Sequence, residues 1–269
     1  MTRTGTPTLT ILQRLARGDL LISDGATGTY LQQHGLEPGG CPEAFNVSHP
    51  EVVRGMANAY FDAGSDLVMT NSFGGSRLMQ KKYGFEDRVR EFNRLAAAHA
   101  KSQALPGHYV VGSVGPTGVF LEPLGEVSEE AMYDAFVEQI TALEEGGVDG
   151  VAIETMTAIE ESKLAIKAAR EHTQLTIMAT MTFDKSPRGF FTIMGVPVER
   201  AVKELVAAGA DIVGANCGNG IDVMIELAQQ LRAATNGYLL LQANAGIPAI
   251  KDGKIMYPET PAYMAERNG

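Results

Sequence analysis

The residue with the clearest chemical potential in this chain is a lone cysteine, Cys217, which follows an apolar run at 212–215 and precedes a glycine-rich turn at 218–220. A thiol at the end of a strand, on a flexible loop, can bind a metal ion or act as a nucleophile. The only other cysteine, Cys41, lies far upstream in the sequence. The alternative is a structural one, since free cysteines are often buried as small apolar residues.

Two acidic residues, Glu154 and Asp24, also occupy positions that favour a functional role. Glu154 ends the fully apolar run 151–153, where a carboxylate costs free energy unless it meets a cation or hydrogen-bond donors. Asp24 opens the turn 24–29, whose two glycines let backbone N–H groups face a small anion; a tight strand-to-helix turn is the alternative. Together the two carboxylates can hold an ammonium group and the turn a carboxylate. This combination predicts a site for a zwitterionic amino acid, with Cys217 across its mouth.

A pattern that occurs three times indicates how these residues are positioned. A helical segment ends at glycine, a short turn passes through aspartate, and a strand apolar on both faces ends at Asn71, Glu154 or Asn216. Glycine can adopt the left-handed conformation after a helix, and strands apolar on both faces are typical of parallel sheets covered by helices. Further strands of the same alternation are expected at 20–23, 109–113, 175–179 and 239–242.

Seven strands separated by helices predict a (β/α)8 TIM barrel in a single domain spanning residues 1–269, with a doubly wound open sheet as the alternative. A helix is expected from Ser128 to Glu145, because Ser128 is a good N-cap and apolar residues recur at helical spacing. Strand eight is missing from this sequence. We expect either that the sequence stops before the natural end or that something else closes the gap.

The composition restricts the class of partner. Hydrophobic residues make up 45% and charged residues 20% of the chain, which is typical of a soluble globular protein. The formal net charge of -10 argues against a nucleic-acid or anionic-membrane partner. Two cysteines cannot staple a fold of this length, and the sequence has neither a signal-peptide pattern nor an apolar run long enough to span a membrane. We therefore expect a cytoplasmic protein.

The strand-end motifs, in this order, resemble the homocysteine S-methyltransferase family. That family includes the homocysteine-binding module of cobalamin-dependent methionine synthase and betaine–homocysteine methyltransferase. The resemblance covers essentially the whole chain. It rests on six collinear landmarks, at residues 24–29, 70–73, 112–116, 154–155, 214–217 and 244–246.

The resemblance implies that homocysteine is methylated to methionine at a zinc ion held by three cysteines, with the homocysteine thiol as fourth ligand. Zinc lowers the pKa of a bound thiol, so that a nucleophilic thiolate exists at neutral pH. Cys217 is then a catalytic residue and zinc ligand, and Glu154 a catalytic residue that binds the amino group together with Asp24. The other implied substrate-binding residues are Gly25, Ala26, Thr27, Asn71, Asn216 and Asn244.

The chain departs from the family at the zinc site. The family's other two ligands are an adjacent Cys-Cys pair after strand eight, and this sequence has no such pair. Cys41 is a poor substitute, because it lies in the loop after the first helix. We therefore expect an incomplete zinc site, and we favour truncation of the sequence over a natural relative that lacks zinc.

The methyl donor is inferred from two positions. Betaine-using relatives have aromatic residues after strands two and four, whereas Gly74 and Thr155 stand at the corresponding places here. This favours methylcobalamin or another donor supplied in trans, with a corrinoid protein as a possible partner. The alternatives are a corrinoid-linked demethylase or methyltransferase without a three-cysteine zinc site, and a non-catalytic relative.

Overall fold

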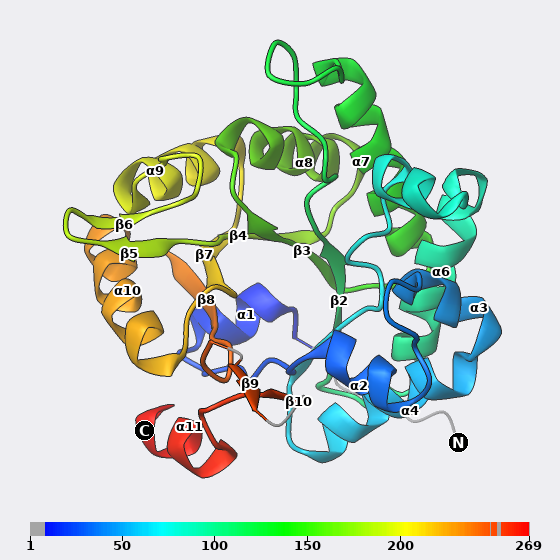
Figure 1. The fold of residues 1–269 in the computed structure, drawn as a ribbon, viewed down its shortest axis with the longest axis horizontal. Helices are drawn as coiled ribbons and strands as arrows, with labels where there is room; N and C mark the ends of the chain where they lie inside the picture. The colour runs from blue at the N-terminus through cyan, green and yellow to red at the C-terminus, as the bar shows by residue number, and fades with distance from the viewer. Residues whose placement is uncertain (1–8, 248, 252–253, 269) are drawn as a thin grey trace. The chain divides into compact units, whose positions relative to one another are not determined.

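The computed structural model describes residues 9–247, 249–251 and 254–268 (Figure 1). Six strands form one sheet in the order β1-β2-β3-β4-β7-β8. The pairings of β1 with β2, β4 with β7 and β7 with β8 are parallel, as expected for strands that alternate with helices. The strands are β1 Leu67–Met69, β2 Tyr109–Val114, β3 Gly150–Met156, β4 Thr176–Met181, β7 Ile212–Asn216 and β8 Tyr238–Gln242.

The chain divides into two compact units. Unit 1 comprises Met1–Ala152 and Ala168–Ile177, and unit 2 comprises Ile153–Lys167 and Met178–Gly269. The division cuts through β3, β4 and the helix between them, so each unit contains part of the sheet. The single domain expected from the sequence stays a prediction.

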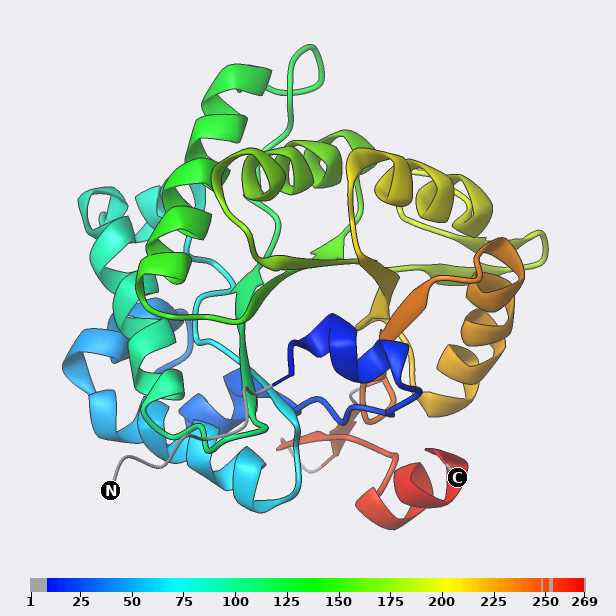
Figure 2. The same cartoon turned by 180° about the vertical axis from the view of Figure 1, so that it is seen from behind.

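Helices follow most of the strands. In unit 1, α6 and α7 are neighbours (Figure 1), and in unit 2, α9 and α10 are neighbours, as the view from behind shows in yellow and orange (Figure 2). The helices are α1 Ile11–Ala16, α2 Thr27–Gln33, α3 Phe45–Ser48, α4 Pro50–Asp62, α5 Arg77–Gln80, α6 Val89–Lys101, α7 Glu129–Glu145, α8 Ile159–His172, α9 Val198–Ala208, α10 Ile221–Ala234 and α11 Pro261–Asn268, with 3-10 turns η1 Pro42–Ala44, η2 Lys81–Tyr83 and η3 Glu86–Arg88.

The repeated glycine–aspartate turns have the conformation that the sequence predicts. Gly64, Gly147 and Gly209, which follow α4, α7 and α9, have φ angles of 101°, 96° and 109°. Glycine adopts this left-handed conformation without a Cβ clash. In the first two turns the aspartate side chain also joins the start of the next strand to a neighbouring segment. Asp66 accepts a hydrogen bond from the N–H of Ile22, and Asp149 accepts one from the N–H of Val110 in β2.

The predicted helix at 128–145 is confirmed as α7. Ser128 is its N-cap and accepts a hydrogen bond from the N–H of Ala131. The apolar side chains that recur at helical spacing are all fully buried; they are Met132, Phe136, Ile140 and Leu143. The spacing therefore identified the buried face as well as the helix.

The strand expected at 20–23 is wrong as a full strand. Only Ser23 forms a bridge, to Leu67 of β1, although the carbonyl of Ile22 also accepts hydrogen bonds from the N–H groups of Asp66 and Leu67. Leu20 and Ile22 are 82% and 52% exposed. The segment is apolar, but β1 engages it at one point, and its large side chains face solvent instead of a core.

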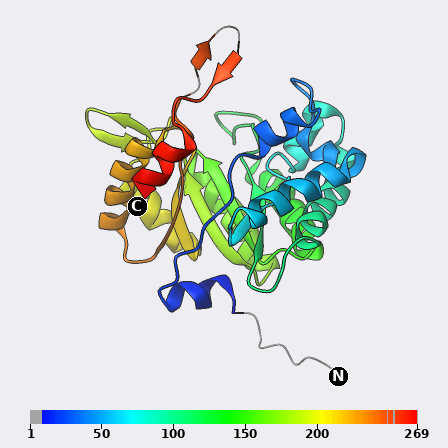
Figure 3. The ribbon, with the colours of Figure 1, turned by 90° about the horizontal axis from the view of Figure 1, so that it is seen from below.

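Two antiparallel hairpins were not expected from the sequence. They pair β5 Asp184–Ser186 with β6 Gly189–Phe191, and β9 Ala249–Lys251 with β10 Lys254–Met256. Figure 3 shows the second hairpin projecting away from α10 and α11 within unit 2. Across the residues that the structure describes, every helix is too short or too polar to cross a membrane.

Candidate functional site

Cys217 lies directly after β7, at the carboxyl end of a strand whose residues are all buried. Its N–H donates to the carbonyl of Gln242 on β8, at 3.1 Å, and its carbonyl accepts from the N–H of Asn219 at 2.8 Å. The thiol itself is half-buried. The strand-end position expected from the sequence is therefore confirmed, and the turn that follows is fixed by backbone hydrogen bonds.

The side chain of Asn216 connects the end of β7 with the end of β3. Its Oδ1 accepts hydrogen bonds from the N–H of Thr155 and the hydroxyl of Thr180, both at 2.8 Å. Its Nδ2 donates to the Thr155 hydroxyl at 2.7 Å and to Oε2 of Glu154 at 3.2 Å. The structure thus brings together three of the predicted site residues: Glu154, Asn216 and Cys217.

Two residues of this cluster, Thr155 within the last part of β3 and Cys217 directly after β7, have unusual backbone conformations. Thr155 and Cys217 have φ angles of 60° and 59°, and they are the only non-glycine residues with positive φ in the described part of the chain. For a β-branched residue such as threonine this conformation is an outlier. Each such residue costs about 1–3 kcal/mol, which the surrounding structure must offset, and such strain is concentrated at functional sites.

The thiol of Cys217 has a mixed electrostatic environment. Burial raises its pKa, and the neighbouring charge of Glu154 raises it further, whereas hydrogen bonds from Thr155 and Asn216 lower it. The Thr155 hydroxyl lies 3.7 Å from the sulfur. Because the net shift is upward, the isolated protein holds Cys217 as a neutral thiol, and a nearby cation would be needed to favour the thiolate.

Asn244 belongs to the same part of unit 2. Its N–H donates to the carbonyl of Asn219, at 3.0 Å, so the loop after β8 is joined to the turn after Cys217. Glu259 reinforces this connection, because its carboxylate accepts from the N–H of Ile221 at 2.8 Å while its own N–H donates to Ala245. The two loops are therefore held together by backbone hydrogen bonds and by the half-buried carboxylate of Glu259.

The predicted residues 24–27 lie in unit 1, immediately before and at the start of α2. Asp24 accepts a hydrogen bond from the N–H of Met69 at 2.8 Å, which ties the turn to β1. The hydroxyl of Tyr60, on α4, donates to the carbonyl of Ala26 at 2.9 Å. A Cβ on Gly25 would lie 3.1 Å from that hydroxyl, so glycine is favoured there by the tyrosine. Burial, and then the charge of Asp24, raises the pKa of Tyr60 to about 12.

Asn71, also in unit 1, is buried with its amide group satisfied by protein. It donates to the carbonyl of Pro42 at 2.8 Å and to Oδ1 of Asn46 at 3.1 Å, and Asn46 in turn donates to the carbonyl of Asn71. The neighbouring Glu43 is only 2% exposed and accepts from the N–H of Gly74 at 2.7 Å. The loop after β1 is thus fixed by buried side chains of the segment 41–46.

Several residues of these networks were missed in the sequence. Thr180 is buried near the end of β4, and the Thr182 hydroxyl donates to the carbonyl of Asn216 at 3.0 Å. Polar residues that end an apolar strand are the signal that could have identified both. For Tyr60 and Glu43, the sequence contains no comparable signal, because both lie on segments that only the fold brings to β1.

A zinc ion in a structural site takes four ligands, commonly cysteine sulfur and histidine nitrogen. Among the residues that the structure describes, no group of three His, Cys, Asp or Glu side chains can hold a metal ion. Cys217 can supply a single sulfur. The described donors therefore do not fit a three-cysteine zinc centre.

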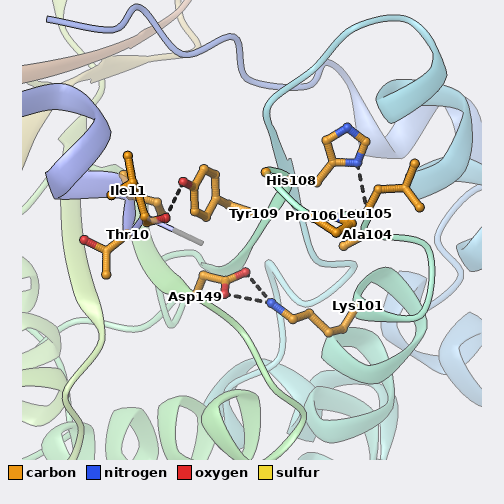
Figure 4. Close-up of a pocket in the computed structure, with 11 residues that line it drawn as sticks. Thr10, Ile11, Lys101, Ala104, Leu105, Pro106, His108, Tyr109 and Asp149 are labelled. Carbon is orange, nitrogen blue, oxygen red and sulfur yellow. Dashed lines mark hydrogen bonds and ion pairs between the residues drawn. The ribbon is translucent and has the colours of Figure 1, made fainter. Parts of the chain in front are cut away.

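A cavity of about 440 Å³ in unit 1 lies at the opposite, amino end of a strand, where β2 begins. Its polar side chains bind one another or the backbone: Lys101 contacts both oxygens of Asp149 at 2.7 and 2.6 Å, and Tyr109 donates to the carbonyl of Leu9 (Figure 4). In α/β barrels, residues at this end generally serve stability. The carboxyl ends of β3 and β7 are the better candidate for chemistry.

Known proteins share both sequence and fold with this chain. A family model described as homocysteine S-methyltransferase matches residues 21–269. Methionine synthase of Mycobacterium leprae (strain TN) is 30% identical over 275 residues, which cover 95% of this chain, and methionine synthase of Mycobacterium tuberculosis (strain ATCC 25618 / H37Rv) is 29% identical, covering 92%. This chain spans 22% of the length of each of these two relatives.

Among solved structures, the metallated form of the homocysteine methyltransferase MmuM from Escherichia coli has a TM-score of 0.74. The alignment covers 85% of both chains at 21% identity. The oxidized form of the same protein has a TM-score of 0.72 at 22% identity, over 84% of this chain and 82% of that one. At this level of identity the likeness establishes a shared fold only.

Proposed function

Because this chain belongs to the homocysteine S-methyltransferase family, we propose that it transfers a methyl group to the sulfur of homocysteine and so forms methionine. The observation that carries the proposal is the cluster at the carboxyl ends of β3 and β7, where Glu154, Asn216 and Cys217 are joined by hydrogen bonds. The family match extends across both of these strands. The methionine synthase relatives support the same acceptor.

In this proposal Glu154 binds the ammonium group of homocysteine. It is a half-buried carboxylate in the last part of β3, directly after the apolar residues 151–153, so a cationic ligand would offset the cost of removing it from water. Charge-assisted hydrogen bonds of this kind are among the stronger polar interactions in proteins. Asp24, Gly25, Ala26, Thr27, Asn71 and Asn244 stay predicted substrate-binding residues.

The proposed role of Cys217 is to bind a metal ion through its sulfur. One MmuM structure is described as a metallated form, and zinc is the metal that the resemblance implies. Since the described residues provide one sulfur and no complete set of ligands, zinc binding here requires ligands beyond that set. The proposal is therefore limited to Cys217 as one ligand.

We also propose that the six parallel strands belong to a (β/α)8 barrel, and that the methyl donor is methylcobalamin or another donor supplied in trans. The barrel is supported by the strand–helix alternation and by the likeness to MmuM over 85% of the chain. The donor is supported by the methionine synthase relatives. A corrinoid protein is the corresponding partner.

The test is an assay for methionine. The full-length protein is incubated with homocysteine and either methylcobalamin or betaine, and methionine is quantified by mass spectrometry. We expect methionine with methylcobalamin, and none from a Cys217→Ser variant. Methyl transfer involving the corrinoid without any dependence on homocysteine would instead identify a corrinoid-linked demethylase. Absence of homocysteine binding by calorimetry would contradict the proposal altogether.

A further inference from the structure

The side chain of Asn216 has no capacity to bind a ligand. A carboxamide offers two lone pairs on its oxygen and two N–H donors. Oδ1 accepts from the N–H of Thr155 and the hydroxyl of Thr180, while Nδ2 donates to Thr155 and Glu154 and lies 3.5 Å from the sulfur of Cys217. Asn216 is 2% exposed. This geometry favours a structural task within the site over the direct substrate contact expected from the sequence.

The orientation of the carboxamide is fixed by its partners. A backbone N–H can only donate, so the atom that faces the N–H of Thr155 must be the oxygen. The hydroxyl of Thr180, which is 1% exposed, lies 2.8 Å from the same oxygen. Nδ2 must therefore face Glu154 and Cys217. Thr180 has no direct contact with either of those residues among the hydrogen bonds of the described chain, so it acts on them only through Asn216.

The residues held by Asn216 are the strained ones. Thr155 is engaged at both its N–H and its hydroxyl, which is a two-point attachment for a residue with a φ angle of 60°. Cys217, with a φ angle of 59°, follows Asn216 directly in the chain. A conformation that these residue types avoid persists only where neighbouring groups determine it. The side chain of Asn216 contacts both of these residues and Glu154.

From these contacts we propose that Asn216 is a positioning residue, which sets the arrangement of Glu154, Thr155 and Cys217 before substrate binds. The inference rests on the proposed function, in which Glu154 and Cys217 take part in the reaction. Thr180 contributes to the same positioning, because its hydroxyl donates to Oδ1 of Asn216 and so helps to orient the carboxamide. Neither residue needs to touch homocysteine.

Two substitutions test the proposal without removing a substrate contact. Asn216→Asp keeps the shape and the acceptor oxygen, but it replaces the donor with a second carboxylate oxygen facing Glu154. Thr180→Val removes only the hydroxyl, and Thr180→Ser restores it. Thr173→Val is the matched control, since the buried Thr173 hydroxyl also donates within the protein, to the carbonyl of Ala169 at 2.8 Å.

Three quantities are measured for each variant: the KM for homocysteine, the unfolding midpoint, and the rate at which a disulfide reagent labels Cys217 in a Cys41→Ser background at one pH. We expect Asn216→Asp and Thr180→Val to raise KM and to change the labelling rate several-fold. In Thr180→Ser, which keeps the hydroxyl, both quantities should be near their wild-type values. Thr173→Val should lower the midpoint alone.

The proposal is overturned if Asn216→Asp and Thr180→Val have the wild-type KM and labelling rate and differ only in stability, as packing residues would. The labelling rate does not depend on methyl transfer. Failure of the wild-type protein to methylate homocysteine would therefore count against the proposed function, whereas an unchanged labelling rate would count against positioning by Asn216.

Discussion

The two units contain the same three chemical groups in contact with one another: a thiol, a carboxylate and a carboxamide. In unit 1 they belong to Cys41, Glu43 and Gln80, with the sulfur 3.4 Å from Glu43 and 3.3 Å from Gln80. In unit 2 they belong to Cys217, Glu154 and Asn216. A list of side chains would assign both clusters the same function.

The clusters differ in access and in backbone conformation. Cys41 and Glu43 are 8% and 2% exposed, and Cys41 has an ordinary extended backbone with a φ angle of -82°. Cys217 and Glu154 are half-buried, and Cys217 lies in a strained turn. Enclosure and regular geometry indicate a structural cluster, whereas partial exposure and strain indicate a site.

The thiol pKa does not separate the two clusters. Burial, and then the charge of Glu43, raises the pKa of Cys41 to about 11, and burial raises the pKa of Cys217 as well. Both thiols are therefore protonated at neutral pH in the isolated protein. What separates them is exposure, since Cys41 is buried whereas Cys217 is partly exposed.

The largest effect is expected from a substitution of Cys217, and it tests whether the unit 2 cluster is a functional site. In the full-length protein, Cys217→Ser should reduce methionine formation to the background rate, because the serine hydroxyl does not replace a thiolate as a metal ligand at neutral pH. The measurements are methionine formation and metal bound per protein. Cys41→Ser is the matched control and should retain both. Equal losses in the two variants would remove the distinction between the thiols.

The next largest effect is expected at Glu154. Glu154→Gln keeps the size of the side chain and removes the charge that is proposed to bind the homocysteine ammonium group. Losing one charge-assisted hydrogen bond should raise KM by about ten- to a hundredfold, as measured by initial rates. Glu160→Gln is the control, since Glu160 lies in the first turn of α8 with a side chain 60% exposed. A wild-type KM for Glu154→Gln would remove Glu154 from the substrate site.

Glu43, the buried counterpart of Glu154, should instead affect stability. Its two oxygens accept hydrogen bonds from the N–H of Gly74 and from Gln80, so Glu43→Gln directs an amide N–H₂ group at another donor. An unmatched buried polar group costs about 1–3 kcal/mol, which lowers the unfolding midpoint by several degrees in thermal denaturation.

The exposed Glu37 provides the control for that experiment, and Glu37→Gln should leave the midpoint unchanged. The KM for homocysteine should be near the wild-type value in both variants. If Glu43→Gln raised KM as strongly as Glu154→Gln at equal stability, the unit 1 cluster would be functional as well.

Much of this organisation follows from local sequence. The glycines before β1, β3 and β7 need positive φ, and the apolar run before Cys217 requires a buried strand, so the strand ends carrying Asn71, Glu154 and Asn216 could be predicted. The dipeptide Asp-Gly at 252–253 and the tripeptide Pro-Arg-Gly at 187–189 are sequence signals that could have predicted the two hairpins.

The networks could not be predicted in the same way. Asn216 contacts Thr155 and Thr180, which are 61 and 36 residues away in the chain, and Glu43 contacts Gly74 at a separation of 31. No period or motif encodes such pairs, because they depend on which strands become neighbours. The strand expected at 20–23 failed for a related reason: its apolar residues resemble a core strand, yet only one bridge to β1 forms.

The smallest expected effect concerns Cys41 itself. Serine can still donate to Glu43 but fills less space, so Cys41→Ser should lower stability slightly near pH 7 and leave KM unchanged.

The pH dependence of the stability that Cys41 contributes is more informative. The folded protein favours the neutral thiol, because burial raises the pKa of Cys41 from its ordinary value of 9.0 to about 11. The corresponding stabilisation is complete below pH 9 and is lost as pH rises through 11. In urea titrations at pH 8 and pH 10.5, the wild-type protein should lose more unfolding free energy than Cys41→Ser, because the tyrosines that titrate in this range are common to both. An equal loss would mean that Cys41 does not titrate as a buried thiol, and the contrast with Cys217 would then depend on backbone geometry alone.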